Sequence, residues 1–163
     1  MKKKILIIGA SILQLPAIKK AKEMGLEVAV ADFNPEAIGV SYADKYFNAS
    51  TIDIEAIVRV AEEYQPDGII TLATDMPMRS IAVATSKLGL VGITSDTALK
   101  STDKAEMIKA FRSAGVPVPW YYIVENEAVF NENFAKFTFP CIMKPTDNSG
   151  SRGVVLIKSV DEL

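Results

Sequence analysis

Short apolar runs alternate with helical patterns along the first part of the chain, and this alternation constrains the fold more than any other feature. The apolar runs are residues 4–8, 27–31 and 68–72. Hydrophobic spacing typical of amphipathic helices predicts helices over residues 15–24, 53–64 and 79–88. Strands that alternate with helices of about ten residues are typical of a parallel sheet covered on both faces. The sequence therefore predicts an α/β fold with a doubly wound parallel sheet.

Three segments follow the predicted strands, and in such sheets ligands bind at the carboxyl ends of the strands. These segments are residues 9–13, 32–34 and 73–75. The first lacks the G-x-G-x-x-G spacing of a dinucleotide site, which argues against a nicotinamide cofactor. Asp32 ends its strand where a dinucleotide fold holds a ribose, but it suits a turn equally well. Asp75 ends the third strand region and is a candidate substrate contact.

The pattern changes near residue 99, so we expect one domain over residues 1–99 and a second over 100–163. Ser101, Thr102 and Asp103 are typical of a helix start, and they predict a helix to about residue 113. Further along, a strand is predicted over 120–124, a helix over 127–136 and a helix start at 159–162. This second domain is expected to be small, α+β and incomplete at its C-terminal end, because its few elements form a poor core.

A lysine and a glycine-rich loop lie between two apolar stretches near the end of the chain. Lys144 follows the apolar run 139–143, the loop covers residues 148–153, and a second apolar run covers 154–157. Glycine and serine allow several backbone N–H groups to converge on phosphate oxygens. Lys144 and Arg152 supply positive charge, and a lysine in an apolar strand favours an anionic partner. The segment predicts a hairpin that binds phosphate groups.

Composition excludes several classes of protein. The net charge of −2 gives no general attraction to nucleic acid or to anionic lipid. The chain has no histidine, which excludes Ser-His and Cys-His catalysis and His-ligated zinc. Its single cysteine, Cys141, is expected to pack as a small hydrophobic residue. No apolar stretch has the length of a signal peptide core or a membrane span, and we expect a cytoplasmic protein.

Three motifs, taken in order, resemble the ATP-grasp superfamily. They are Asp103-Lys104 at the start of a helix that ends in 114–119, the run 139–145, and the loop 148–154. The resemblance is to the branch of biotin carboxylase and the large subunit of carbamoyl-phosphate synthase. Carboxylase-like members carry a longer glycine run in the loop than this chain does. Residues 9–17 and 30–35 are similar to the Rossmann-like pre-ATP-grasp domain of those enzymes.

The resemblance implies roles for individual residues. Lys104 and Lys144 match the lysines that bind the nucleotide phosphates. The loop that closes over the β- and γ-phosphates of ATP is matched by Ser149, Gly150, Ser151, Arg152 and Gly153. Gly9, Ala10 and Ser11 would lie on the carboxylate or bicarbonate side. The Mg²⁺ ligands and the catalytic arginines are expected downstream of this chain, so we expect no catalytic or metal-binding residue within it.

The resemblance also implies an activity for a longer parent protein. That protein would use ATP to join a carboxylate or bicarbonate to an amine or ammonia through an acyl- or carboxy-phosphate. This chain would then be an N-terminal fragment, inactive alone, that contributes half of the ATP site. Two alternatives stay open: a naturally short subunit that needs a partner chain, and a nicotinamide-dependent oxidoreductase. The expected partners are the small substrates and either a second copy or a partner subunit, with no nucleic acid or membrane.

Overall fold

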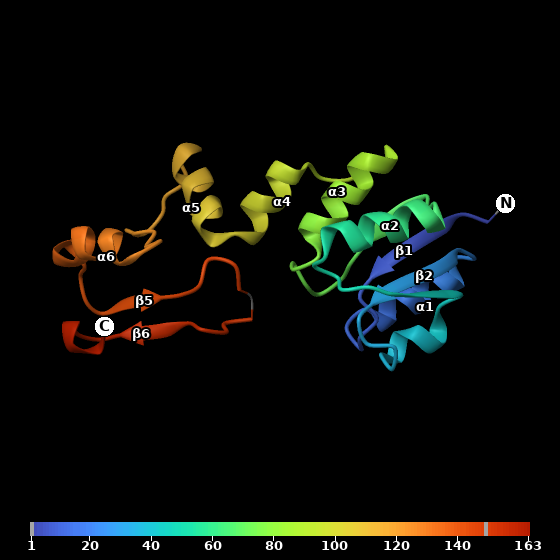
Figure 1. Ribbon diagram of the computed structural model, residues 1–163, viewed down its shortest axis with the longest axis horizontal. Coiled ribbons are helices and arrows are strands. Elements are labelled where there is room, and N and C mark those ends of the chain that lie inside the picture. The colour runs from blue at the N-terminus through green and yellow to red at the C-terminus, as the bar shows by residue number, and fades with distance from the viewer. Residues whose placement is uncertain (1, 149) are drawn as a thin grey trace. The chain divides into compact units, whose positions relative to one another are not determined.

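The computed structural model describes residues 2–148 and 150–163, which form two compact units (Figure 1). The first unit is Met1–Thr102 and the second is Asp103–Leu163. Helix α4 (Ser95–Thr102) is the last element of the first unit. The division into named domains at residues 99 and 100 stays a prediction.

Four parallel strands form the sheet of the first unit, in the order β3-β2-β1-β4. Their bounds are β1 Lys4–Ile8, β2 Glu27–Asp32, β3 Lys45–Asn48 and β4 Gly68–Ile70. Ile5 of β1 pairs with Val28 on one side and with Gly68 on the other. β1 has a strand on each side and helices over both faces, so both of its faces are buried. Successive residues of β1 are therefore apolar. The predicted α/β fold with a parallel sheet is confirmed.

Helices cover both faces of this sheet (Figure 1). They are α1 Leu15–Glu23, α2 Ile54–Tyr64 and α3 Met78–Leu88, with the short 3₁₀ helix η1 Ile38–Tyr42. Successive strand residues point to opposite faces. Leu6 and Ile8 accordingly pack in a cluster with α2 and α3, whereas Ile7 packs in a second cluster with α1. The three predicted helices are confirmed, with ends shifted by one residue.

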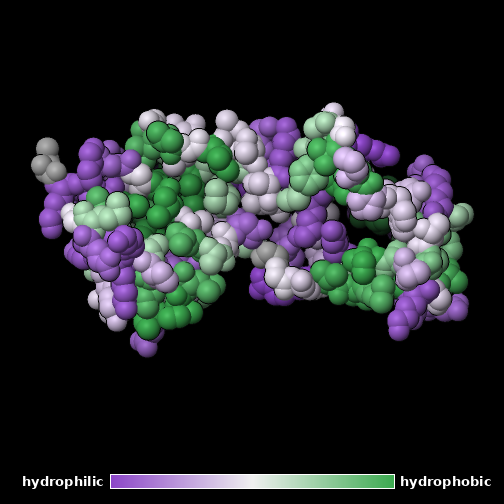
Figure 2. All heavy atoms as spheres, turned by 180° about the vertical axis from the view of Figure 1, so that it is seen from behind, coloured by the Kyte–Doolittle hydropathy of each residue, from purple (hydrophilic) through white to green (hydrophobic). Residues whose placement is uncertain are grey.

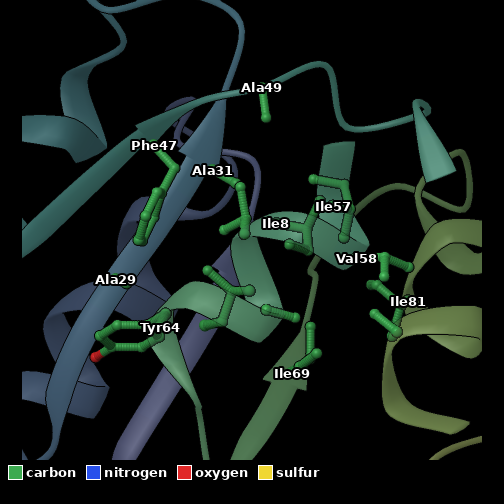
Figure 3. Close-up of a cluster of buried hydrophobic side chains, with 14 residues drawn as sticks. Ile8, Ala29, Ala31, Phe47, Ala49, Ile57, Val58, Tyr64, Ile69 and Ile81 are labelled. Carbon is green, nitrogen blue, oxygen red and sulfur yellow. The ribbon is translucent and has the colours of Figure 1, made fainter. Parts of the chain in front are cut away.

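Tyr64 connects the end of α2 to the strands (Figure 3). Its ring meets that of Phe47 edge to face, with the ring centroids 6.0 Å apart. Its hydroxyl donates a hydrogen bond of 3.0 Å to the carbonyl oxygen of Glu27 in β2. Burial raises the pKa of Tyr64 above its ordinary value, so the hydroxyl stays protonated and keeps donating.

β3 and α4 were not predicted from the sequence, because few of their residues are buried. β3 is an edge strand in which only Phe47 is buried, so it shows no continuous apolar run. α4 buries only Ala98. Ser101 and Thr102 belong to the end of α4, so the predicted helix start at 101–103 is wrong for these two residues. Asp103 alone is the cap of the next helix.

The second unit contains a two-stranded antiparallel sheet and two α-helices among its described residues. The elements are α5 Lys104–Ser113, α6 Glu127–Asn133, η2 Phe134–Lys136, β5 Cys141–Met143, β6 Val155–Ile157 and η3 Val160–Glu162. The predicted strand over 120–124 is wrong. In the described part of this unit, β5 and β6 pair only with each other. The Trp120 ring contacts the Tyr122 ring, which in turn contacts the Phe137 ring. An apolar segment without a neighbouring strand has no ladder to join.

Few side chains of the second unit are buried. Among its described residues, only Ala105 and Ile157 fall in the buried class. Ile142 and Leu156 of the hairpin are 56% and 50% exposed. Figure 2 shows this hydrophobic surface over the β5–β6 hairpin. Separately, no helix in residues 2–148 and 150–163 is long and apolar enough to cross a membrane.

Gly39 of η1 packs tightly against the loop that follows β1. A Cβ added at Gly39 would lie 2.6 Å from the carbonyl oxygen of Ala10, whereas one added at Gly68 meets nothing within 4 Å. We therefore expect Gly39→Ala to lower the free energy of unfolding by about 2 kcal/mol, because backbone has to move. Gly68→Ala is the matched control and should change it by less than about 1 kcal/mol. Equal effects of the two substitutions in urea denaturation would contradict this packing.

Asp44 ties α1 to β2 and makes the stability of the first unit depend on pH. Its carboxylate accepts hydrogen bonds from the Lys22 ammonium and, at 2.8 Å, from the Val28 N–H. The bond from Lys22, with a smaller contribution from Val28, lowers the pKa of Asp44 below its ordinary value. A lowered pKa stabilises the folded state above the unfolded-state pKa, and this contribution is lost as the pH falls through the folded-state pKa.

Asp44→Asn should therefore destabilise the chain at neutral pH and flatten the loss of stability below about pH 4. The amide oxygen of asparagine can still accept from Val28, so the variant removes mainly the charge. Urea denaturation across the acid range measures both effects. If the free energies of unfolding of wild type and variant differ by the same amount from neutral to acid pH, Asp44 does not cause the pH dependence of stability.

Candidate functional site

The hairpin predicted near the end of the chain is present and holds a loop between its strands. β5 and β6 are antiparallel, with Cys141 opposite Ile157 and Met143 opposite Val155. The chain from residue 144 to residue 154 therefore leaves one strand and returns beside it. This places Lys144 and Val154 at the two ends of one loop.

The start of α5 is bonded to this loop. The Asp103 carboxylate caps the helix by accepting from the N–H groups of Ala105 and Glu106 at 2.9 and 3.0 Å. The N–H of Lys104 donates to the carbonyl oxygen of Thr146 at 2.8 Å. The Lys104 ammonium donates to the carbonyl oxygen of Asn148. Two bonds therefore hold a lysine from a distant part of the sequence against the loop.

A pocket of about 290 Å³ lies where α5 and the loop meet. Three cationic side chains contribute to its wall: Lys104, Lys144 and Arg152. Its other lining residues are Ile142, Pro145, Asn148, Gly150, Ser151 and Val154. This described lining contains no carboxylate, so all of its charged side chains are cationic. The pocket suits an anion with several charged oxygens.

Lys144 is not buried in an apolar strand, contrary to the sequence-based expectation. It lies beyond the last residue of β5 and is exposed. Burial in an apolar strand therefore does not force an anionic partner upon it. What marks Lys144 is its place in the wall of a pocket that two other cations also line.

The loop has left-handed backbone at three described positions. Gly150, Ser151 and Gly153 have φ of 65°, 58° and 75°. A Cβ at Gly153 would lie 2.8 Å from Cγ of Pro145, whereas a Cβ at Gly150 would meet nothing within 4 Å. Gly150 and Ser151 line the pocket, and Gly153 instead packs against the Pro145 ring. Ser149, which was also predicted to bind phosphate, lies outside the described residues.

Asn148 is a residue of this pocket that the sequence analysis did not single out. Besides accepting from Lys104 through its carbonyl, it donates from Nδ2 to the carbonyl oxygen of Arg152 at 3.3 Å. Asparagine is common in loops because its side chain bonds to nearby backbone. That preference alone could have marked Asn148 as a loop residue, but not as a neighbour of Lys104.

The predicted substrate residues Gly9, Ala10 and Ser11 donate their backbone N–H groups in hydrogen bonds to other residues of the first unit. The N–H of Gly9 donates to Ala31 O at 2.7 Å, and that of Ala10 donates to the Asp32 carboxylate at 2.7 Å. The N–H of Ser11 donates to Oε1 of Gln14 at 3.2 Å. These bonds give the segment a structural role, and its contact with a substrate stays a prediction.

Gln14 joins the loops that follow β1 and β4, and the sequence analysis missed it. Its side chain is buried, donates from Nε2 to the carbonyl oxygen of Leu72 at 2.5 Å, and accepts from the Ser11 hydroxyl at 2.6 Å. Gly9 has a φ of 94°, and a Cβ there would lie 3.1 Å from Cδ of Gln14. No local pattern marks a buried glutamine whose partner is 58 residues away.

Asp32 and Asp75 lie in the two other loops at this edge. The Asp32 carboxylate also accepts from the N–H of Asn34 at 2.9 Å, so both of its oxygens bind backbone. These contacts favour the turn role of Asp32 over the ribose role. Asp75 is exposed at the turn before α3, where its carbonyl accepts from Met78 at 3.0 Å. A substrate contact of Asp75 stays a prediction.

The residues present do not fit a magnesium site. In the described part of the chain there is no group of three or more His, Cys, Asp or Glu residues that could hold a metal ion. Mg²⁺ prefers carboxylate and phosphate oxygens, and the described pocket wall offers no carboxylate. Ligands downstream of this chain stay a prediction.

Comparisons with known proteins find relatives over nearly the whole chain, although no family model matches. The formate-dependent phosphoribosylglycinamide formyltransferase of Bacteroides thetaiotaomicron is 29% identical over 163 residues, covering 99% of this chain and 42% of that protein. The crystal structure of phosphoribosylglycinamide synthetase from Anaerococcus prevotii has a TM-score of 0.75 and 26% identity, covering 99% of this chain and 40% of that one.

A third relative is an N5-carboxyaminoimidazole ribonucleotide synthetase solved as an ADP complex. Its TM-score is 0.80 at 27% identity, covering 98% of this chain and 42% of that one. The comparisons support the ATP-grasp superfamily. They do not support the narrower resemblance to carbamoyl-phosphate synthase and biotin carboxylase. This chain spans about two fifths of the length of the relatives that it matches.

The two glycines of the loop should respond differently to a methyl group. Gly153→Ala combines left-handed backbone with a clash against Pro145, whereas Gly150→Ala carries only the backbone cost. We expect amide hydrogen exchange in β5 and β6 to become about tenfold faster in Gly153→Ala than in Gly150→Ala. Similar exchange rates in the two variants would contradict the packing of Gly153 on Pro145.

Proposed function

We propose that this chain provides the phosphate-binding half of the site of an ATP-dependent ligase. The observation that carries the proposal is the convergence of Lys104, Lys144 and Arg152 on one pocket. The three residues come from the start of α5, the position just after β5 and the segment before β6. Lys144 and Arg152 share one hairpin loop, but nothing in local sequence order requires Lys104 to join them. Like charges gather at a cost unless an anion joins them.

The chemistry of the pocket suits the phosphates of ATP. Lysine supplies a mobile point charge and arginine a planar fork that can bind two phosphate oxygens at once. The pocket of about 290 Å³ is at the lower end of the range for small-molecule sites, about 300–1,000 Å³. This size favours the phosphate groups over a whole nucleotide. The adenosine part would then contact residues outside this pocket.

The proposed reaction begins with transfer of the γ-phosphoryl group of ATP to a carboxylate or bicarbonate oxygen, releasing ADP. An amine or ammonia then attacks the acyl- or carboxy-phosphate, and inorganic phosphate leaves as the C–N bond forms. Lys104, Lys144 and Arg152 would neutralise phosphate charge during transfer and are not general acids or bases. The loop from Ser149 to Gly153 would close over the β- and γ-phosphates and keep water from the reactive intermediate.

The substrate class is also a proposal. The relatives are named for formate and for phosphoribosylglycinamide or carboxyaminoimidazole ribonucleotide. These names are compatible with a small carboxylate and an amine, as a carbamoyl-phosphate synthase-like protein would also use. In the first unit, segments 32–38 and 71–77 contain acidic residues, and neither they nor segment 9–14 contain lysine or arginine. A contact of Asp75 with substrate would therefore suit an amine better than an anion, whereas Gly9, Ala10 and Ser11 would lie on the carboxylate or bicarbonate side.

A whole ligase needs groups that the described residues do not offer. The magnesium ligands and catalytic arginines would come from further residues of a longer protein or from a partner subunit, and a homodimer is a third arrangement. By itself, the chain is expected to bind phosphate without turning over ATP. The nicotinamide alternative is weakened because backbone N–H groups already occupy both oxygens of Asp32.

Replacing Lys144 should weaken nucleotide binding selectively. We expect Lys144→Ala to reduce the affinity of the chain for ATP about tenfold, because a charged hydrogen bond to phosphate is lost. Lys136→Ala is the matched control, since it removes the same charge from an exposed residue that does not line the pocket. Isothermal titration calorimetry measures both. No ATP binding by the wild type, or an equal loss in both variants, would refute the proposed function.

A further inference from the structure

We propose that Asn148 is a positioning residue that holds Lys104 and Arg152 at the same phosphate pocket. The inference rests on the proposed function and adds a residue with no assigned role. Asn148 lies in the pocket wall with both cationic residues. It is also bonded to each of them, through two different groups of the same residue.

The first bond acts on Lys104. The carbonyl oxygen of Asn148 accepts from the Lys104 ammonium, while Thr146 accepts from the Lys104 N–H at 2.8 Å. Together they fix the lysine at its backbone and at its charged end. A lysine side chain otherwise loses considerable rotamer freedom when it binds a ligand. Holding it beforehand lowers that cost.

The second bond acts on the loop. The Asn148 carboxamide donates from Nδ2 to the carbonyl oxygen of Arg152 at 3.3 Å. It links two loop residues that are four positions apart in the sequence, with Gly150 and Ser151 between them. Because Gly150 and Ser151 adopt left-handed backbone, this part of the chain is not held by regular secondary structure.

An uncharged side chain suits position 148 in the wall of a cationic pocket. Lys104 and Arg152 carry like charges, which favour moving apart when no anion is bound. The bond from Lys104 uses the backbone carbonyl of Asn148, so the side chain matters through its Nδ2 donor to the main-chain carbonyl of Arg152. An aspartate could not donate there, and it would cancel part of the charge that the phosphate needs, whereas the neutral carboxamide donates and leaves the positive potential of the pocket unchanged.

The experiment compares affinity for inorganic tripolyphosphate across the 163-residue chain and its variants. Asn148→Ala removes the Nδ2 bond and keeps all three cations. We expect it to weaken tripolyphosphate binding about fivefold to tenfold. The slope of the logarithm of affinity against the logarithm of salt concentration should stay that of the wild type, because the number of paired charges is unchanged.

Two further variants separate positioning from general stability. Asn133→Ala is the matched control: its Nδ2 donates to Val129 O at 2.9 Å in α6, and it does not line the pocket. It should change stability without changing tripolyphosphate affinity. Asn148→Asp keeps the shape of the side chain but adds a negative charge. It should bind more weakly than Asn148→Ala and show a smaller salt slope. If Asn148→Ala fails to fold, wild-type tripolyphosphate affinity in Asn148→Asp overturns the inference.

The outcomes distinguish this inference from the proposed function. Wild-type affinity in Asn148→Ala, with Lys144→Ala impaired, overturns the role of Asn148 and leaves the phosphate site standing. Equal losses in Asn148→Ala and Asn133→Ala also overturn it, because they show a general effect of stability. If the wild type does not bind tripolyphosphate, both the proposed function and this inference fail.

Discussion

The burial of β1 on both faces and between two neighbouring strands is the constraint on which the first unit depends. Ile7 packs on one face and Leu6 and Ile8 on the other, so each helix layer is anchored to the same strand. Parallel strands end at a common edge, and the loops there are joined by hydrogen bonds from Gln14 and to Asp32. The edge is therefore held chiefly by backbone and buried polar groups, which leaves its exposed acidic residues available for other contacts.

The second unit is held together by hydrogen bonds more than by a buried apolar core. Its described residues bury little apolar surface, and hydrogen bonds between α5 and the loop supply the local order that a larger core would provide. These bonds run from Lys104 to carbonyl oxygens and not to carboxylates. The same contacts that order the loop thus preserve the positive charge of the pocket. Structure and proposed function are linked here because an anion would relieve the repulsion between the gathered cations.

Sequence reasoning predicted elements well where a hydrophobic period or a cap was strong. α2 shows this, because Asp53 caps it and its apolar face packs on the sheet. It did poorly where few residues are buried, as in β3 and α4, and where aromatic residues mimic a strand, as at Trp120. Within the candidate site, Lys104, Lys144 and Arg152 were chosen from motifs. Gln14 and Asn148 were missed because their roles lie in contacts with distant residues or backbone.

The sequence by itself determined the alternation of β1, α1, β2, α2, β4 and α3 along the chain and the loop chemistry of residues 148–153. These features depend on neighbours a few positions apart, which a single chain displays directly. Only the tertiary structure decided that Lys104 lies beside Asn148, and that the Asp32 carboxylate is occupied by backbone. Such contacts join residues far apart in the chain, and they form only when packing of the separate elements brings those residues together.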